Sequence, residues 1–167
     1  IRLEHRQKFQ SAMSNKDREG DGNVNSEKAV NFGENVSMAG LAEMKALKRP
    51  PLAVAELAKT VLLLLGKDKR NLNWKQFQKA AGNPRALLQE MQHLDVESVE
   101  QWRMRSAQQY ALLDWFDVAA LRNASQAAAE LAVWVLAVIE YHDVLEAHKQ
   151  ALQENQPDQQ PAASNDQ

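Results

Sequence analysis

The residues of this chain that could do chemistry are scattered. Four histidines, at positions 5, 93, 142 and 148, show no spacing that would let them share a metal ion. His142 and His148 are six residues apart, which places them on different sides of one helix. No nucleophile or paired acid stands beside them, so general acid–base or nucleophilic catalysis has no candidate constellation. We therefore predict that the chain is not an enzyme and has no catalytic residue and no cofactor.

Residues 17–28 carry the one pattern that approaches a metal site. Asp17, Glu19 and Asp21 occupy the first, third and fifth places of a calcium loop of the EF-hand type. Lys28, however, takes the twelfth place, where a bidentate carboxylate should close the coordination shell. We interpret the segment as a polar linker and predict no metal site, with calcium binding by residues 17–28 as the open alternative.

The composition excludes several classes of protein. The chain has 167 residues, of which 44 % are hydrophobic, enough for the core of one ordinary domain. It has no cysteine, which excludes disulfides and thiolate ligands and fits a reducing compartment. A net charge of −2 gives no basic field for nucleic acid or a membrane surface. The most apolar run, Thr60–Leu65, is far shorter than the ~20 residues of a membrane span, and the charged first ten residues do not resemble a signal peptide.

Helix signals dominate the rest of the sequence. Residues 37–48 have helical spacing, and Pro50 and Pro51 then stop or kink the helix, because the residue before a proline resists helical geometry. A new apolar helix can start at once and end at Gly66, which suits a left-handed cap. Farther along, Asn73 and Asn83 are expected to cap short helices over 74–81 and 85–93, and Asp95 a helix over 96–113. The residues expected on the buried side of the helix over 96–113 are Val99, Trp102, Ala107 (or Ser106) and Tyr110, and the chain's tryptophans are expected in the core.

The final helix is predicted from about Asn123 to Glu154. Its apolar positions step by four and three residues, a heptad seam typical of a coiled coil. The seam consists of Ala124, Ala128, Leu131, Val135, Val138, His142 and Leu145, continued by Lys149 and Leu152. The first half is apolar on more than one face, so we expect it to begin in a globular core and to leave it as one strand of a coiled coil.

These signals predict an all-α fold of five to seven helices over about residues 37–155, with the last helix leaving the bundle as one strand of a coiled coil. We expect a polar, disordered segment over 1–36, the helical domain over 37–155, and a disordered tail over 156–167.

Basic residues bracket the ends of the two main apolar helices. Such a local basic surface on a slightly acidic domain suits an acidic protein partner. The groups are Lys45, Lys48 and Arg49 before the kink, Lys67, Lys69, Arg70, Lys75 and Lys79 after the first apolar helix, and Arg122 where the last helix is expected to begin.

In its order of motifs, the chain resembles the microtubule-binding domain at the stalk tip of dynein heavy chains. The stretch LAEMKALKRPPLAVAELAKTVLLLLG resembles the point where one stalk helix ends at a Pro-Pro kink and an apolar helix follows. Leu72-Asn73-Trp74-Lys75-Gln76 resembles the next helix, and Arg122-Asn123-Ala124-Ser125 with Trp134 and Tyr141 resembles the last one. The resemblance covers about residues 37–155.

The resemblance implies a small helical bundle at the end of a short antiparallel coiled-coil stalk, with residues 37–155 as the microtubule-binding domain and its stalk ends. Antiparallel contact between 41–48 and 142–152 would then form the base of the stalk. The resemblance also implies that this tip binds α/β-tubulin in the microtubule, in the cytoplasm and cytoskeleton, including the axoneme of a cilium or flagellum. By position it suggests Lys75, Lys79, Arg122 and Arg49 as microtubule contacts. Ala55 stands where many relatives carry a basic residue, and Val118 where some carry an acidic one, so the affinity for tubulin is expected to be weaker or altered.

Two functions of different classes follow. The first is microtubule binding, as part of or derived from a minus-end-directed motor whose ATPase ring would lie in the parent protein. The second is a helical interaction module that pairs with a coiled-coil partner through its heptad ends and has no affinity for tubulin.

Overall fold

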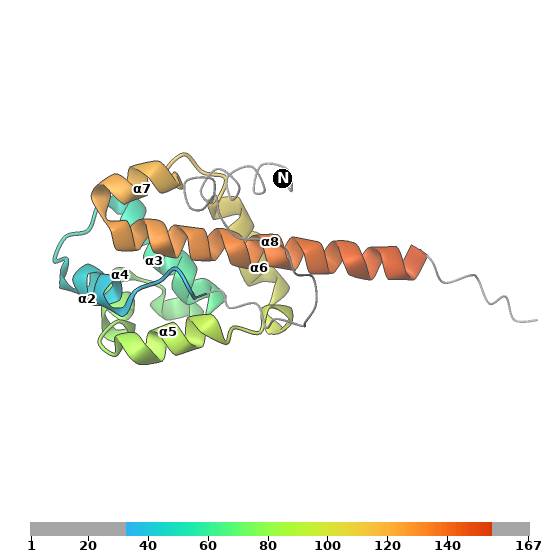
Figure 1. Cartoon of the computed structure of the whole chain (residues 1–167), viewed down its shortest axis with the longest axis horizontal. Helices are drawn as coiled ribbons and strands as arrows, with labels where there is room; N and C mark the ends of the chain where they lie inside the picture. Colours follow the sequence, from blue (N-terminus) through green and yellow to red (C-terminus); the bar gives the residue numbers. More distant parts are fainter. Residues whose placement is uncertain (1–32, 155–167) are drawn as a thin grey trace, which may run out of the picture.

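The computed structural model describes residues 33–154, and these form an all-α bundle without a β-strand (Figure 1). Residues 1–32 of the expected polar segment, with the calcium-like loop at 17–28, and the expected C-terminal tail lie outside the described residues. The α-helices of the described part are α2 (Met38–Ala46), α3 (Leu52–Leu64), α4 (Trp74–Ala80), α5 (Pro84–Gln92), α6 (Gln101–Tyr110), α7 (Val118–Ala124) and α8 (Gln126–Glu154), with 3-10 turns η1 (Lys69–Asn71) and η2 (Val96–Ser98).

Helix α8 is the axis of the fold. It has 29 residues, about 43 Å at 1.5 Å per residue, and its first half lies among the other helices while its second half projects beyond them (Figure 1). Its neighbours are α2, α3, α6, α7 and η2. Inside the bundle it is buried on several faces, through Ala127, Ala128, Ala129, Leu131, Ala132, Trp134, Val135, Leu136, Val138 and Ile139. No helix in the described part is both long and apolar enough to cross a membrane.

Local capping chemistry explains most helix ends. The side chains of Asn73 and Asn83 accept hydrogen bonds from backbone amides in the first turns of α4 and α5, as predicted. Gly66 has a φ of 74°, the left-handed conformation expected of it. The amide of Gly66 donates to the carbonyl of Leu63, and that of Lys67 to the carbonyl of Leu62, which completes a Schellman motif at the end of α3.

The predicted helix over 96–113 is wrong in its extent and its buried face. The Asp95 side chain does cap a turn, but this turn is the short η2, and the backbone is extended at Val99 before α6 begins at Gln101. This break resets the helical phase, so Trp102 and Tyr110 are 39 % and 38 % exposed. The residues that α6 buries are Arg103, Met104 and Ala107, of which only Ala107 was predicted.

The expected start of the last helix is also corrected. Residues 118–124 form the separate helix α7, which meets α8 at Ser125. The Ser125 backbone is extended, and its side chain accepts a hydrogen bond from the Ala128 amide at 3.4 Å. Ser125 therefore ends one helix and caps the next, and Arg122 belongs to the last turn of α7.

The predicted base of the stalk does not form between 41–48 and 142–152. The Ser37 amide donates to the Glu130 carboxylate at 3.1 Å, and a Cβ added at Gly40 would lie 2.8 Å from that of Ala127. Helix α2 therefore runs antiparallel to the first turns of α8, at the end of the bundle opposite the projecting part of α8 (Figure 1). The preceding residues 33–36, expected in the disordered segment, form a turn, and Val36 is buried.

A buried arginine binds the C-terminal end of α3, which we call its inner end. The Arg103 guanidinium donates to the carbonyls of Leu63 and Lys67 at 3.1 and 2.8 Å, and to the Glu100 carboxylate at 2.6 Å. It also stacks on the Trp102 ring, 4.6 Å from its centroid. The hydrogen bond from Arg103 holds the pKa of Glu100 below its ordinary value. Arg103 thus joins α6 to the C-terminal end of α3, where a positive charge is favourable.

Replacing Arg103 with methionine should lower the free energy of unfolding by about 2–4 kcal/mol, because two carbonyls lose a buried donor. Urea unfolding followed by circular dichroism measures this. Arg105→Met, an exposed change on the same helix, is the matched control and should cost no more than about 0.5 kcal/mol. Equal losses in the two variants would contradict the role given to Arg103.

Candidate partner-binding face

A short loop between α2 and α3 is held in place by two side chains of α4. The Trp74 indole donates to the Leu47 carbonyl at 3.2 Å. The Gln78 amide donates to the carbonyls of Lys45 and Leu47 at 2.9 and 3.2 Å. Residues 47–51, with Pro50 and Pro51 at the end, are not helical, so the prolines separate two helices instead of bending one. The loop is therefore fixed although much of it is exposed.

The N-terminal end of α3, which we call its outer end, is open in the sense that no side chain caps it. Pro51 occupies the N-cap position, no side chain caps the helix, and the first turn contains no acidic residue. The unpaired amides of a first helical turn carry partial positive charge. Leu52, the first residue of α3, is 74 % exposed. This end of the helix thus combines a positive dipole with an exposed apolar side chain.

Two of the predicted contact residues lie at the same end of the molecule. Arg49 is exposed in the loop before α3, and Arg122 is exposed in the last turn of α7. Helix α7 packs against α3, and Figure 1 shows the loop and the α7–α8 turn at the same end of the bundle, opposite the projecting end of α8. We define the tip face as Arg49, Leu52, Arg122 and the open first turn of α3.

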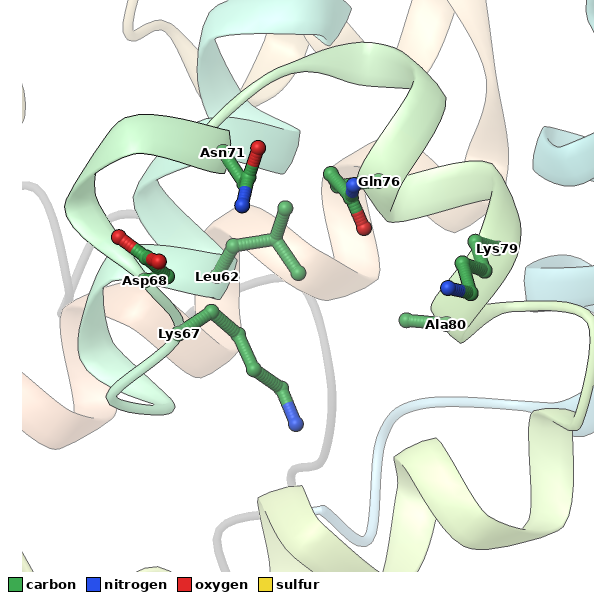
Figure 2. Close-up of a pocket in the computed structure, with 7 residues that line it drawn as sticks. All are labelled: Leu62, Lys67, Asp68, Asn71, Gln76, Lys79 and Ala80. Atoms are coloured by element: carbon green, nitrogen blue, oxygen red, sulfur yellow. The ribbon is translucent and has the colours of Figure 1, made fainter.

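The two predicted lysines of α4 do not join a single cluster with these residues. Lys75 is exposed in the first turn of α4, next to Trp74 and hence close to the loop. Lys79, one turn later, lines a cavity of about 350 Å³ at the inner end of α3 (Figure 2). Helix α4 packs against α2, α3 and α5, whereas α7 packs against α3 and α8, so α3 is the neighbour that the two share.

The cavity between α3 and α4 has a polar rim. Figure 2 shows Leu62 at its centre, with Lys67, Asn71, Gln76 and Lys79 around it. Lys67 forms an ion pair with Glu90 of α5. Hydrogen bonds from the side chain and the backbone amide of Arg70 lower the pKa of the neighbouring Asp68. Among the described residues, Lys79 has no ion pair, so it is the rim cation that is available to a partner.

Polar side chains hold α8 where it leaves the bundle. Gln108 of α6 donates to an Asp143 oxygen at 2.8 Å, and the His142 ring lies 3.4 Å from the same oxygen. The other Asp143 oxygen is buried without a hydrogen-bond partner. Six residues after Asp143, Lys149 lies 3.6 Å from Glu97 of η2, and its hydrogen bond with Glu146 raises the pKa of Lys149. His142 is thus half-buried on the seam beside a carboxylate, and the described residues contain no group of three potential metal ligands.

The sequence did not single out Leu52, although a signal for its exposure was present. The core face of α3 is formed by Val54, Leu57, Ala58 and Val61, which follow helical spacing. Leu52 precedes Val54 by two positions, about 200° around the helix, so it belongs to the opposite face. Arg103 and Asp143 gave no comparable signal, because their partners come from distant segments.

Comparison with known proteins places this arrangement in a family. A family model described as the microtubule-binding stalk of dynein motor matches residues 4–165. The chain belongs to this family. The open tip face and the projecting α8 are therefore parts of a dynein stalk domain, and the all-α bundle agrees with the expected fold.

Several curated dynein chains are similar to this stalk domain. The flagellar outer-arm alpha chain of Chlamydomonas reinhardtii is 30 % identical over 117 residues, which are 68 % of this chain and 3 % of that protein. The ciliary beta chain of Tripneustes gratilla is 27 % identical over 107 residues, 62 % of this chain and 2 % of that one. Dynein axonemal heavy chain 17 of Homo sapiens is 27 % identical over 120 residues, which are 68 % of this chain and 3 % of that protein. The chain thus spans only 2–3 % of the length of these relatives.

Replacing Gln78 with leucine should loosen the loop before α3, because the Lys45 carbonyl loses its side-chain donor and the Leu47 carbonyl keeps only the Trp74 indole. Hydrogen exchange at the Leu47 amide, which donates to the Met44 carbonyl at the start of the loop, should speed up about tenfold, the change expected when bonds worth about 1–2 kcal/mol are lost. Mass spectrometry of a peptide covering the loop measures it. Gln109→Leu, an exposed change on α6, should leave this peptide unaffected. Unchanged exchange in Gln78→Leu would mean that the Trp74 hydrogen bond and the prolines fix the loop without Gln78.

Proposed function

We propose that this chain is the tip of a dynein stalk and that it binds microtubules through the tip face. The observation that carries the proposal is the gathering of Arg49, Arg122 and the open end of α3 at the end opposite the projecting α8. A stalk must place its binding face away from the end that continues toward the rest of the motor. Membership of the stalk family supports the choice of partner.

Electrostatics favour an acidic partner surface at this face. Arg49 and Arg122 are exposed, and the first turn of α3 adds partial positive charge that no acidic side chain offsets. Charges of this kind raise the rate of association and set orientation, and salt screens them. The proposed partner is α/β-tubulin in the microtubule lattice. Lys75 lies beside the tip face and Lys79 farther along α4, so we assign them a secondary part.

The proposal extends to the parent protein. The similar chains are named flagellar, ciliary and axonemal dyneins, which supports a place in the axoneme, part of the cytoskeleton within the cytoplasm. The parent protein would be a minus-end-directed motor whose ATPase lies outside this chain. Ala55 and Val118 are both half-buried and uncharged, so the tip face relies on fewer charges than the resemblance leads us to expect.

Neutralising Arg122 should weaken microtubule binding and leave the fold intact, because its side chain is exposed. In co-sedimentation with stabilised microtubules, Arg122→Gln should raise Kd about three- to tenfold, and Arg122→Glu should raise it further. The effect should shrink as salt is added. Arg105→Gln, an exposed arginine on α6, is the matched control. Equal pelleting of both glutamine variants would refute the assignment of the face.

A second candidate function is favoured by the projecting end of α8. Val144 and Leu152 are 49 % and 56 % exposed on a helix that extends beyond the described bundle (Figure 1). Apolar residues on a projecting helix are typical of coiled-coil pairing. The alternative is therefore a module that pairs through α8 with another helix and has no affinity for tubulin.

Light scattering after size exclusion separates the two functions. Under the first proposal, the chain is monomeric at micromolar concentration and pellets with microtubules. Under the alternative, it forms dimers that the double change Val144→Ser and Leu152→Ser dissociates, and it stays in the supernatant. A monomer that does not pellet would count against both.

A further inference from the structure

Leu52 is the most exposed large apolar side chain in the described part of the chain. Its exposed fraction is 74 %, against 56 % for Leu152 and 47 % for Leu113. Single exposed leucines are common on protein surfaces and carry no meaning by themselves. The question is whether the surroundings of Leu52 distinguish it from such a leucine.

The backbone of Leu52 is unusually well fixed for an exposed position. Pro50 and Pro51 precede it, and each proline restricts the backbone. The loop before them is held by the bonds from Trp74 and Gln78 to the Leu47 carbonyl. After Leu52, α3 turns its core face inward through Val54, Leu57, Ala58 and Val61, all fully buried. Leu52 is thus presented outward by a rigid frame, which lowers the entropy lost when a partner covers it.

The charges around Leu52 indicate what kind of surface covers it. Arg49 lies three residues before it, Arg122 lies on the neighbouring α7, and the open first turn of α3 begins at Leu52 itself. A partner that faces these groups has acidic residues around the point where Leu52 makes contact. The arrangement of an apolar centre with a charged rim is the one found in protein–protein interfaces.

We propose that Leu52 is the apolar anchor of the tip face and inserts between acidic groups on the microtubule surface. This inference rests on the proposed function and adds a second component to it. Arg49 and Arg122 supply attraction that salt screens, whereas burial of Leu52 supplies affinity that salt does not screen. Binding by this tip therefore persists at salt concentrations that abolish a purely charge-driven contact.

The test is a series of Kd values for the 167-residue chain, measured by microtubule co-sedimentation at increasing salt. Leu52→Ser should raise Kd about tenfold at every salt concentration and leave the slope of log Kd against log salt unchanged. Arg122→Gln should instead reduce that slope. Leu52→Met should restore most of the affinity, because it keeps an apolar side chain of similar volume. Leu152→Ser, an exposed leucine at the far end of α8, is the matched control and should bind like the wild type.

The outcomes separate failure of this inference from failure of the proposed function. If the wild type pellets and Leu52→Ser pellets equally well, the anchor is refuted while microtubule binding stands. If Leu52→Ser changes the salt slope as Arg122→Gln does, Leu52 acts by placing charges, and the anchor is also refuted. If the folded wild type never pellets, microtubule binding fails, and the inference fails with it. Circular dichroism and thermal unfolding establish that each variant is folded.

Discussion

Burial of the first half of α8 is the constraint on which the rest of this structure depends. Between Ala127 and Ile139 the helix is apolar on several faces, and a helix of that kind must be surrounded. Helices α2, α3, α6 and α7 supply the cover. Most of them have ten residues or fewer, too short to be stable alone in water, so contact with α8 fixes both their existence and their positions.

The two ends of α3 differ in their capping. The C-terminal, inner end is capped and joined to the core, whereas the N-terminal, outer end has no side-chain cap and belongs to the tip face. At the inner end, the Schellman motif and Arg103 satisfy the carbonyls and join α3 to α6. At the outer end, Pro51 gives no side-chain cap and Leu52 faces solvent. The outer end therefore keeps polar and apolar groups that are available to a partner. Such separation of a stable scaffold from a less satisfied binding end is common at functional sites.

The features that could be predicted from the sequence are those that depend on neighbouring residues. Asn73 and Gly66 act within a turn of their own positions, so their types suffice to place helix ends. The break in the helix before Gln101 contains no proline or glycine, so residue types give no signal for it. Because the break was not predicted, Trp102 was assigned to the buried face, whereas it is exposed. The hydrogen bond from Arg103 to the Lys67 carbonyl spans 36 residues, and only the tertiary fold creates it. The same holds for the candidate site. The sequence shows which residues are basic, but only the packing of the helices determines which of them lie on one face.

The contact between α2 and α8 has a steric consequence. Gly40 and Ala127 bring the two backbones so close that one added methyl group would clash, and Ser37 supplies a single hydrogen bond across the contact. A side chain larger than glycine at residue 40 would therefore have to move α2 away from the start of α8. The position of α2, and with it the beginning of the loop that leads to α3, thus depends on the absence of a side chain at this one residue.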